Sequence, residues 1–308
     1  MSTNSGTTAG TDFWSESQPG FRFSSAEVGS PEFFAEVEAH RYALEPHIPE
    51  IVRFERWAGA DVLEAGCGIA TDGVRFARAG AAYTGLDSSP RALELARRRF
   101  GLERCSGSFV HGSVVDLPFS DESFDLVYSH GVIHHVAETE RAISEFRRVL
   151  RPGGTALVMV YHRGSLNYLV NIMVIRRALV GVLAMPGTPA LIARLAGEDP
   201  RILAGHRALL REHGIRYVTD RSLFLSNNTD GPGNPLSKVY SRRQAQQMFD
   251  AFEQVRTDVR YLNLRLYPGS DRLARTALAR RLGRRFGWHL YVEGTKPGGQ
   301  GRGQRGSA

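Results

Sequence analysis

The stretch VLEAGCG at residues 62–68, followed by YTGLDSSP at residues 83–90, decides the fold. A short apolar strand leads into the turn Gly66-Cys67-Gly68, and a second strand ends on Asp87, 19 residues after Gly68. The order strand, glycine turn, helix, strand and acid is typical of a nucleotide-binding βαβ unit. Glycines let the backbone approach a ligand closely, and a carboxylate at that position can accept hydrogen bonds from two ribose hydroxyls. The pattern therefore predicts an α/β protein with a nucleoside-containing ligand.

The glycine turn departs from the pattern that binds a dinucleotide. That pattern, G-x-G-x-x-G, ends in a third glycine, where this chain has Thr71. Glu64 stands beside the turn, and a carboxylate there would repel a pyrophosphate but suit a ligand with an ammonium or sulfonium group. S-adenosylmethionine carries both groups and is the expected cofactor.

Two further segments follow these motifs in a familiar order. They are HGSVVDLPFSDESFDLVYSHGVIHHV at residues 111–136 and RVLRPGGTALVMVY at residues 148–161. With the first two motifs they resemble class I S-adenosylmethionine-dependent methyltransferases of the methyltransferase domain 11 type, especially the branch of ubiquinone and menaquinone ring methyltransferases. The resemblance covers residues 60–161. It implies a Rossmann-like, doubly wound α/β fold, with a seven-stranded, mostly parallel sheet, an antiparallel last strand and a helical lid insertion.

The apolar periodicity gives the expected elements along the chain. Ser30 can cap a helix over 31–44, and Pro31 fits its first position. Core strands are expected near residues 60–64, 81–86, 107–112, 124–129 and 155–161, and core helices near 71–79, 90–100 and 138–150. Later elements are helices at 166–185, 189–197 and 200–213, a loop at 226–238, a helix at 241–250, and strands at 253–262 and 285–296.

These elements divide the chain into six expected segments. They are a disordered N-terminus (1–11), a helical cap (12–57), the cofactor-binding core (58–161), a lid of helices and loops (162–238), the remainder of the core (239–296) and a disordered tail (297–308). In this architecture, an insertion after the fifth strand overhangs the active face and can select the substrate.

The resemblance implies a set of cofactor contacts. In chain order they are Arg41, Tyr42, Glu64, Gly66, Cys67, Gly68, Asp87, Ser88, Ser113, Val114, Ser129 and Gly131. The first two would hold the methionine carboxylate and the next four would lie under the methionine. Asp87 and Ser88 would bind the ribose. Ser113 and Val114 would bind the adenine, and Ser129 and Gly131 would lie beneath the methyl group. Serine is a weaker acceptor than the acid common at position 113, so Asp116 is an alternative adenine partner.

Histidines after the fourth strand are the first candidates for a general base. A base helps only where the acceptor must lose a proton. His134 and His135 stand there, with His134 favoured by the family's His-His position. An alternative is that both cap the loop by bonding to backbone. Tyr161 and His162 are second candidates, and Asp230 in the insertion is a more distant one.

Composition narrows the partners of the chain. The net charge of +7 and pI of about 9.7 permit nucleic acid or anionic membrane, but the arginines are scattered along helices, so no nucleic-acid partner is expected. Two cysteines give no disulfide framework and no metal cluster, so no metal is expected. The reducing cytoplasm is the expected location, since no secretory signal is visible in residues 1–20.

The apolar segment 166–185 raises the question of a membrane span. Arg176 and Arg177 near its middle cost about 5–7 kcal/mol together, which cancels the gain from its apolar residues. No transmembrane span is therefore expected. Weak contact with a membrane surface and a homodimer both stay open.

The sequence thus predicts an enzyme that methylates a small, apolar organic acceptor, such as a secondary-metabolite or isoprenoid-like scaffold. The alternatives are a quinone-ring C-methyltransferase, a nicotinamide-dependent oxidoreductase, a non-catalytic scaffold of the same fold, and an RNA methyltransferase that uses the basic tail at 294–308. The fourth strand ends in Ser129-His130-Gly131-Val132 and lacks the Asn/Asp-Pro-Pro-Tyr signature. This absence argues against methylation of DNA adenine or of glutamine.

Overall fold

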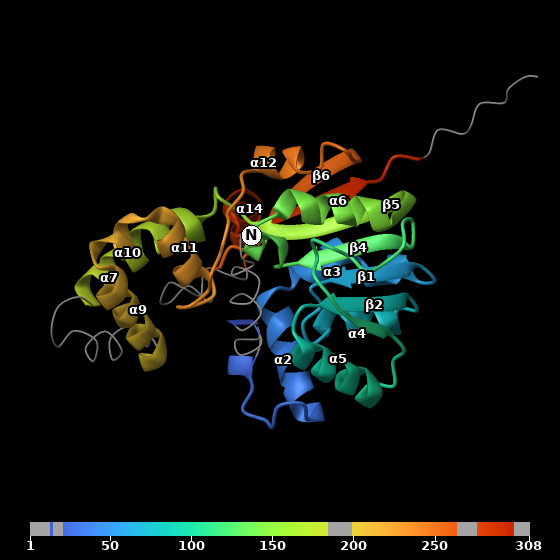
Figure 1. The fold of residues 1–308 in the computed structure, drawn as a ribbon, viewed down its shortest axis with the longest axis horizontal. Coiled ribbons are helices and arrows are strands. Elements are labelled where there is room, and N and C mark those ends of the chain that lie inside the picture. Colours follow the sequence, from blue (N-terminus) through green and yellow to red (C-terminus); the bar gives the residue numbers. More distant parts are fainter. Residues whose placement is uncertain (1–12, 15–20, 184–198, 264–275, 299–308) are drawn as a thin grey trace, which may run out of the picture.

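The computed structural model describes residues 13–14, 21–183, 199–263 and 276–298. These residues form one central sheet and the helices around it (Figure 1). Its seven strands lie in the order β3-β2-β1-β4-β5-β7-β6. Their bounds are β1 (Asp61–Ala65), β2 (Ala82–Asp87), β3 (Ser108–His111), β4 (Phe124–His130), β5 (Leu150–Tyr161), β6 (Glu253–Arg260) and β7 (His289–Thr295). Strands β1 to β5 pair in parallel, and β7 is antiparallel to both β5 and β6. The predicted fold class is confirmed.

Helices cover both faces of the sheet because neighbouring residues of each buried strand point to opposite sides. On one face, Leu63 and Val127 pack with α6 (Thr139–Val149) and α12 (Arg242–Gln247). On the other, Val62 and Tyr128 pack with α4 (Thr71–Arg78) and α5 (Pro90–Leu102). This doubly wound arrangement brings the ends of the parallel strands to one edge, where ligands bind in such folds.

The N-terminal cap consists of η1 (Phe21–Phe23), α2 (Pro31–Leu44), α3 (His47–Val52) and η2 (Phe54–Trp57). As predicted, the Ser30 side chain accepts a hydrogen bond from the Phe33 N–H at the start of α2, and Pro31 occupies the first turn. Buried residues of α2 pack against Ile69, just after the glycine turn, and Leu95 of α5. The cap therefore covers the sheet edge beside the glycine turn.

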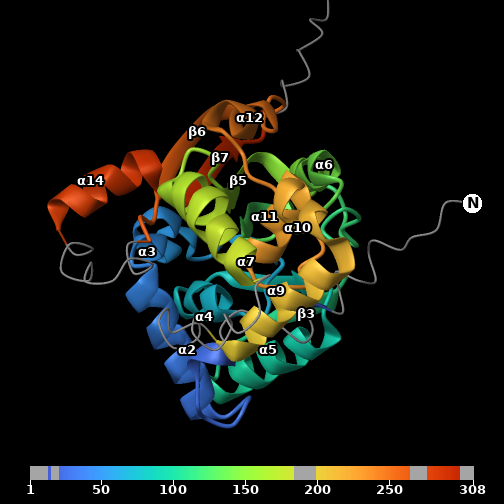
Figure 2. The ribbon, with the colours of Figure 1, turned by 90° about the vertical axis from the view of Figure 1, so that its left-hand side faces the viewer.

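The lid stands apart from the sheet in Figure 1 and in front of its edge in Figure 2. It contains the π-helix η4 (Asn167–Arg176), α7 (Arg177–Leu183), α9 (Pro200–His213), α10 (Ile215–Thr219) and α11 (Arg221–Thr229). Its apolar cluster includes Tyr161 at the end of β5 and Trp288 before β7, which join the lid to the core. Within the described part of the chain, no helix combines the length and apolar character needed to cross a bilayer.

Several boundaries differ from the sequence-based expectations. Residues 226–229 are helical rather than loop, because Asp220 caps α11 by accepting from the Ser222 and Leu223 N–H groups. The last strand starts at 289 rather than 285, since an arginine-rich helix that the sequence did not predict, α14 (Ala277–Phe286), precedes it. Strand β5 starts at Leu150, directly after α6. The expected helix at 189–197, the N-terminus 1–11 and most of the tail 297–308 lie outside the described residues.

Candidate active site

The turn after β1 holds its shape through two glycines with positive φ. The φ angles are +82° at Gly66 and +53° at Gly68. A Cβ built on Gly66 would lie 2.4 Å from the Val132 side chain, so no larger residue fits there without a shift. The N–H groups of Gly66 and Cys67 donate to the Leu86 carbonyl at 2.7 and 3.0 Å. The turn is thus fixed against the end of β2.

Asp87 joins this turn to the start of α5. Its Oδ2 accepts from the Gly68 N–H at 2.8 Å, and its Oδ1 accepts from the Ser89 N–H at 2.9 Å. Burial raises the pKa of Asp87, and the backbone hydrogen bonds act in the opposite direction. Each carboxylate oxygen keeps acceptor capacity for a further donor. The donor set of a ribose, two neighbouring hydroxyls, matches this arrangement.

The Glu64 side chain points into the protein interior rather than toward the solvent side of the glycine turn. The Tyr83 hydroxyl donates to its Oε2 at 2.6 Å, and the side chain is buried. Burial, and secondly the charge of Asp72, hold the pKa of Glu64 well above its usual value, which favours the neutral acid. The expected carboxylate beside a cationic ligand is therefore not the form that this environment favours.

Arg41 and Tyr42 both contact Asp72 in the first turn of α4. Arg41 donates from Nε to Oδ1 at 3.0 Å and from Nη2 to Oδ2 at 2.6 Å, and the Tyr42 hydroxyl donates to Oδ1 at 2.7 Å. Tyr128 donates to Oδ2 at 2.8 Å. Burial would raise the pKa of Asp72, but the charge and hydrogen bonds of Arg41 hold it below its usual value. Asp72 was not among the residues predicted from the sequence, although an acid just after the glycine turn is a visible signal.

Four more of the predicted cofactor positions lie near the carboxyl ends of β3 and β4. Ser113 forms an isolated bridge with Asp116, and the Val114 side chain belongs to the core. The Ser129 hydroxyl donates to the Ala65 carbonyl at 2.9 Å, and Gly131 has a φ of +79°. These contacts bring the glycine turn and residues 129–131 together at one edge. Register pairs Asp87 with His111, so the end of β3 lies beside the end of β2.

Cys67 and Ser88 are the other two predicted cofactor positions. The Cys67 thiol is free and buried, and burial raises its pKa well above the usual value. The Ser88 carbonyl lies 3.1 Å from His111 Nε2. These surroundings do not assign a cofactor atom to either residue.

The two histidines after β4 occupy different environments. His134 is fully buried, and neither of its ring nitrogens has a hydrogen-bond partner within the described ranges. Burial, and then the charge of His135, hold its pKa well below the usual value. His135 instead places Nδ1 2.7 Å from the Leu236 carbonyl, and its Nε2 lies 3.5 Å from Asp230 Oδ2. Bonding to backbone, the alternative raised for both, is observed for His135.

Tyr161, His135 and Asp230 form one cluster where β5, the turn after β4 and the lid meet. The Tyr161 hydroxyl donates to Asp230 Oδ1 at 2.9 Å. The Trp14 ring lies 4.7 Å from the His135 ring, and the Trp288 ring stacks on Tyr161 at 4.2 Å. The Asp230 side chain is 23% exposed and that of His135 is 6% exposed. A phenol and an imidazole thus share one carboxylate beside aromatic rings.

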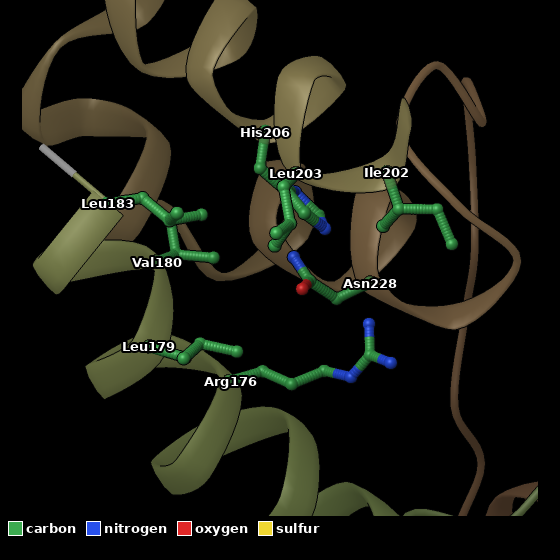
Figure 3. A pocket seen from close by; sticks show the side chains of 8 residues that line it. All are labelled: Arg176, Leu179, Val180, Leu183, Ile202, Leu203, His206 and Asn228. Carbon is green, nitrogen blue, oxygen red and sulfur yellow. The ribbon is translucent and has the colours of Figure 1, made fainter. Parts of the chain in front are cut away.

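Two other features do not belong to this cluster. His162 lies with Nδ1 3.1 Å from the Gly287 carbonyl, which fixes the chain at the end of β5. A cavity inside the lid is lined by Leu179, Val180 and Leu183 facing Leu203 and His206 (Figure 3). The volume within which the centre of a water molecule could move there is only about 10 Å³, so the cavity is far too small for an organic acceptor.

Comparisons with known proteins agree with this geometry. Residues 63–158 match the family model described as a methyltransferase domain. An uncharacterized methyltransferase of Synechocystis is 32% identical over 146 residues, which cover 47% of this chain and 61% of that protein. A demethylmenaquinone methyltransferase of Tropheryma whipplei is 37% identical over 102 residues, 33% of this chain and 41% of that protein. The chain thus aligns with less than two thirds of the length of these relatives.

A solved structure shows the same fold over a longer span. The magnesium protoporphyrin IX methyltransferase of Synechocystis, crystallised with bound S-adenosylhomocysteine, has a TM-score of 0.52 and 14% sequence identity. The match covers 94% of this chain and 99% of that one. At this identity the likeness concerns the fold alone.

Proposed function

Because the chain belongs to the class I S-adenosylmethionine-dependent methyltransferases through its residues 63–158, we propose that it transfers a methyl group from S-adenosylmethionine to a small, apolar organic acceptor. The bound cofactor supplies a methyl group that is already activated. The protein therefore contributes mainly by positioning, which can supply about 7–11 kcal/mol. The observation that carries the proposal is the link between Asp87 and Gly68 at the carboxyl edge of the sheet.

The cofactor part of the proposal rests on the fit of this edge to a nucleoside. Gly66 and Gly68 keep side chains out of the turn, and Asp87 offers a partly buried carboxylate at its side. Hydrogen bonds to a charged group contribute about 1.5–3 kcal/mol each. We propose Asp87 as the ribose-binding residue, with residues 129–131 beneath the reacting end of the cofactor.

Isothermal titration with S-adenosylhomocysteine, with NAD as a control ligand, tests this assignment. We expect binding of the first ligand alone. Asp87→Asn should weaken it at least tenfold, about 1.4 kcal/mol, whereas the exposed Asp250→Asn should leave it unchanged. An unchanged dissociation constant in Asp87→Asn would refute the ribose contact. Binding of NAD alone would favour the oxidoreductase alternative.

The acceptor part of the proposal rests on the cluster of Tyr161, His135 and Asp230. A carboxylate beside an imidazole and a phenol can take a proton from an acidic O–H group of an acceptor and pass it on. The rings of Trp14 and Trp288 beside the cluster favour a flat, apolar acceptor. We therefore propose a hydroxylated aromatic or quinol acceptor. Similarity to a demethylmenaquinone methyltransferase supports an isoprenoid quinol as a second candidate.

Methyl transfer to simple phenols and to an isoprenoid naphthoquinol tests the acceptor class. With an accepted substrate, Asp230→Asn should lower the turnover number by about 10²–10⁴-fold, the usual contribution of a general base. Its affinity for S-adenosylhomocysteine should stay unchanged, and Asp250→Asn again serves as the control. Equal losses in turnover and in cofactor affinity would assign Asp230 to lid structure instead. Full activity of Asp230→Asn would exclude the proposed proton transfer.

A further inference from the structure

Three histidines and a glutamate meet where the N-terminal cap touches the sheet. Glu45 caps the C-terminus of α2, His47 starts α3, His130 ends β4 and His289 starts β7. Since β7 runs antiparallel to β5, its first residue lies at the same edge as the last residues of the parallel strands, and His289 pairs with Tyr161. The fold thereby joins residues that are far apart in the sequence, and the sequence had predicted no metal.

The donor atoms of Glu45, His130 and His289 converge. His130 Nε2 lies 3.9 Å from Glu45 Oε2, and His289 Nε2 lies 3.8 Å from Glu45 Oε1. One ligand atom from each residue lies within 4.8 Å of the others. The distances exceed hydrogen-bond length, and the buried Oε2 has no hydrogen-bond partner in the described part of the chain. Tetrahedral zinc, with bonds of about 2.0–2.2 Å, spaces its ligands slightly over 3 Å apart, so the ligand atoms would have to move together by up to about 1.5 Å.

Both imidazoles are oriented from behind. His130 Nδ1 lies 2.9 Å from the Tyr128 hydroxyl, which itself donates to Asp72. His289 Nδ1 lies 3.2 Å from His47 Nε2. Each Nδ1 is thus engaged by a polar neighbour, and each Nε2 faces Glu45. Metal-binding histidines characteristically use one ring nitrogen for the ion and the other for such an orienting hydrogen bond.

Arg41 and Asp72 bring opposite charges close to this site. Arg41 Nη1 lies 3.6 Å from Glu45 Oε2, but Arg41 makes its two hydrogen bonds to Asp72. When both are ionised, the carboxylates of Glu45 and Asp72 carry two negative charges, and the guanidinium of Arg41 offsets one of them. A tautomer that donates from Nδ1 to Tyr128 or His47 leaves the Nε2 lone pair of each imidazole available to a metal ion.

We propose that Glu45, His130 and His289 bind a divalent transition-metal ion of the zinc class, with His47 and Tyr128 as positioning residues. Two imidazoles and one carboxylate suit zinc, and three protein ligands leave a fourth position for water or an oxygen of another ligand. The Glu45 side chain is 18% exposed against 5% for each histidine, so its side offers the access route. The ion would pin the cap to β4 and β7. This proposal does not depend on methyl transfer.

Cobalt binding to the full-length, tag-free chain, stripped with a chelator, tests the site. Absorption bands of the bound ion report tetrahedral coordination, and zinc should then displace it. We expect one equivalent of cobalt per chain, confirmed by elemental mass spectrometry, and a higher melting temperature with the ion. Wild-type protein that shows neither these bands nor a stoichiometric equivalent would overturn the proposal, whatever the variants do.

Variants then locate the bound ion. His289→Gln and Glu45→Gln should abolish the cobalt bands, with circular dichroism confirming that each variant is folded. His47→Leu should keep the bands but weaken binding about 10–100-fold, the usual cost of losing an orienting partner. The matched control is His206→Gln, because His206 is also buried but lies in the lid. Folded ligand variants that bind cobalt like the wild type would overturn the proposal.

Discussion

Replacing Arg41 with methionine removes the cation that faces the buried carboxylate of Asp72. The Asp72 side chain is 1% exposed, and Arg41 contacts both of its oxygens. Breaking a buried ion pair by removing one partner costs about 3–5 kcal/mol. Because Arg41 is 25% exposed and the hydroxyls of Tyr42 and Tyr128 still donate to Asp72, we expect the lower end, about 3 kcal/mol.

Urea and thermal unfolding, followed by circular dichroism, measure this loss. For a domain of about 150–250 residues, each kcal/mol lowers the melting temperature by about 2–4 °C, so a loss of about 6–12 °C is expected for Arg41→Met. The control is Arg56→Met, because Arg56 is 54% exposed and its pairing with Glu293 is worth at most about 1 kcal/mol. In an Asp72→Asn background, Arg41→Met should cost markedly less. If Arg41→Met destabilises the protein no more than Arg56→Met, the buried pair does not hold the cap as argued.

Three further predictions concern the glycine turn, the lid and the acceptor cluster. Gly66→Ala should destabilise the protein in urea more than Gly59→Ala, because both have positive φ but only the first Cβ meets a neighbouring side chain; equal losses would show that this neighbour moves freely. Burial lowers the pKa of His206 to about 4, whereas a histidine in the unfolded chain has a pKa near 6.5. As the pH falls, the unfolded state therefore binds the proton first, and the free energy of unfolding decreases between pH 6.5 and 4. His206→Gln should lessen that fall in urea unfolding at pH 7 and pH 4.5, and parallel pH profiles would contradict the assignment. Tyr161→Phe removes the hydroxyl that donates to Asp230 and should slow turnover without changing S-adenosylhomocysteine affinity; an undiminished turnover number would argue against it.

Local sequence determined the core of this protein. The glycine turn, the spacing to Asp87 and the apolar runs predicted strands close to β1, β2 and β4, because these signals depend on neighbouring residues and on backbone geometry alone. The Ser30-Pro31 cap likewise fixed the start of α2. The periodicity was less informative in the lid, where a π-helix replaces part of the expected α-helix. It also missed the arginine-rich α14, although Leu278, Leu282 and Phe286 recur there at helical spacing between arginines.

Only the tertiary structure decided which side chains meet. Asp230 lies 69 residues from Tyr161 in the sequence, and nothing local indicates that the lid returns its carboxylate to that hydroxyl. Glu45, His130 and His289 converge because an antiparallel last strand begins where the parallel strands end. Arg41 and Tyr42 face Asp72 because α2 packs across the start of α4. Sequence patterns specify what each element is, whereas long-range packing specifies which polar groups share one buried space, and chemistry depends on the second.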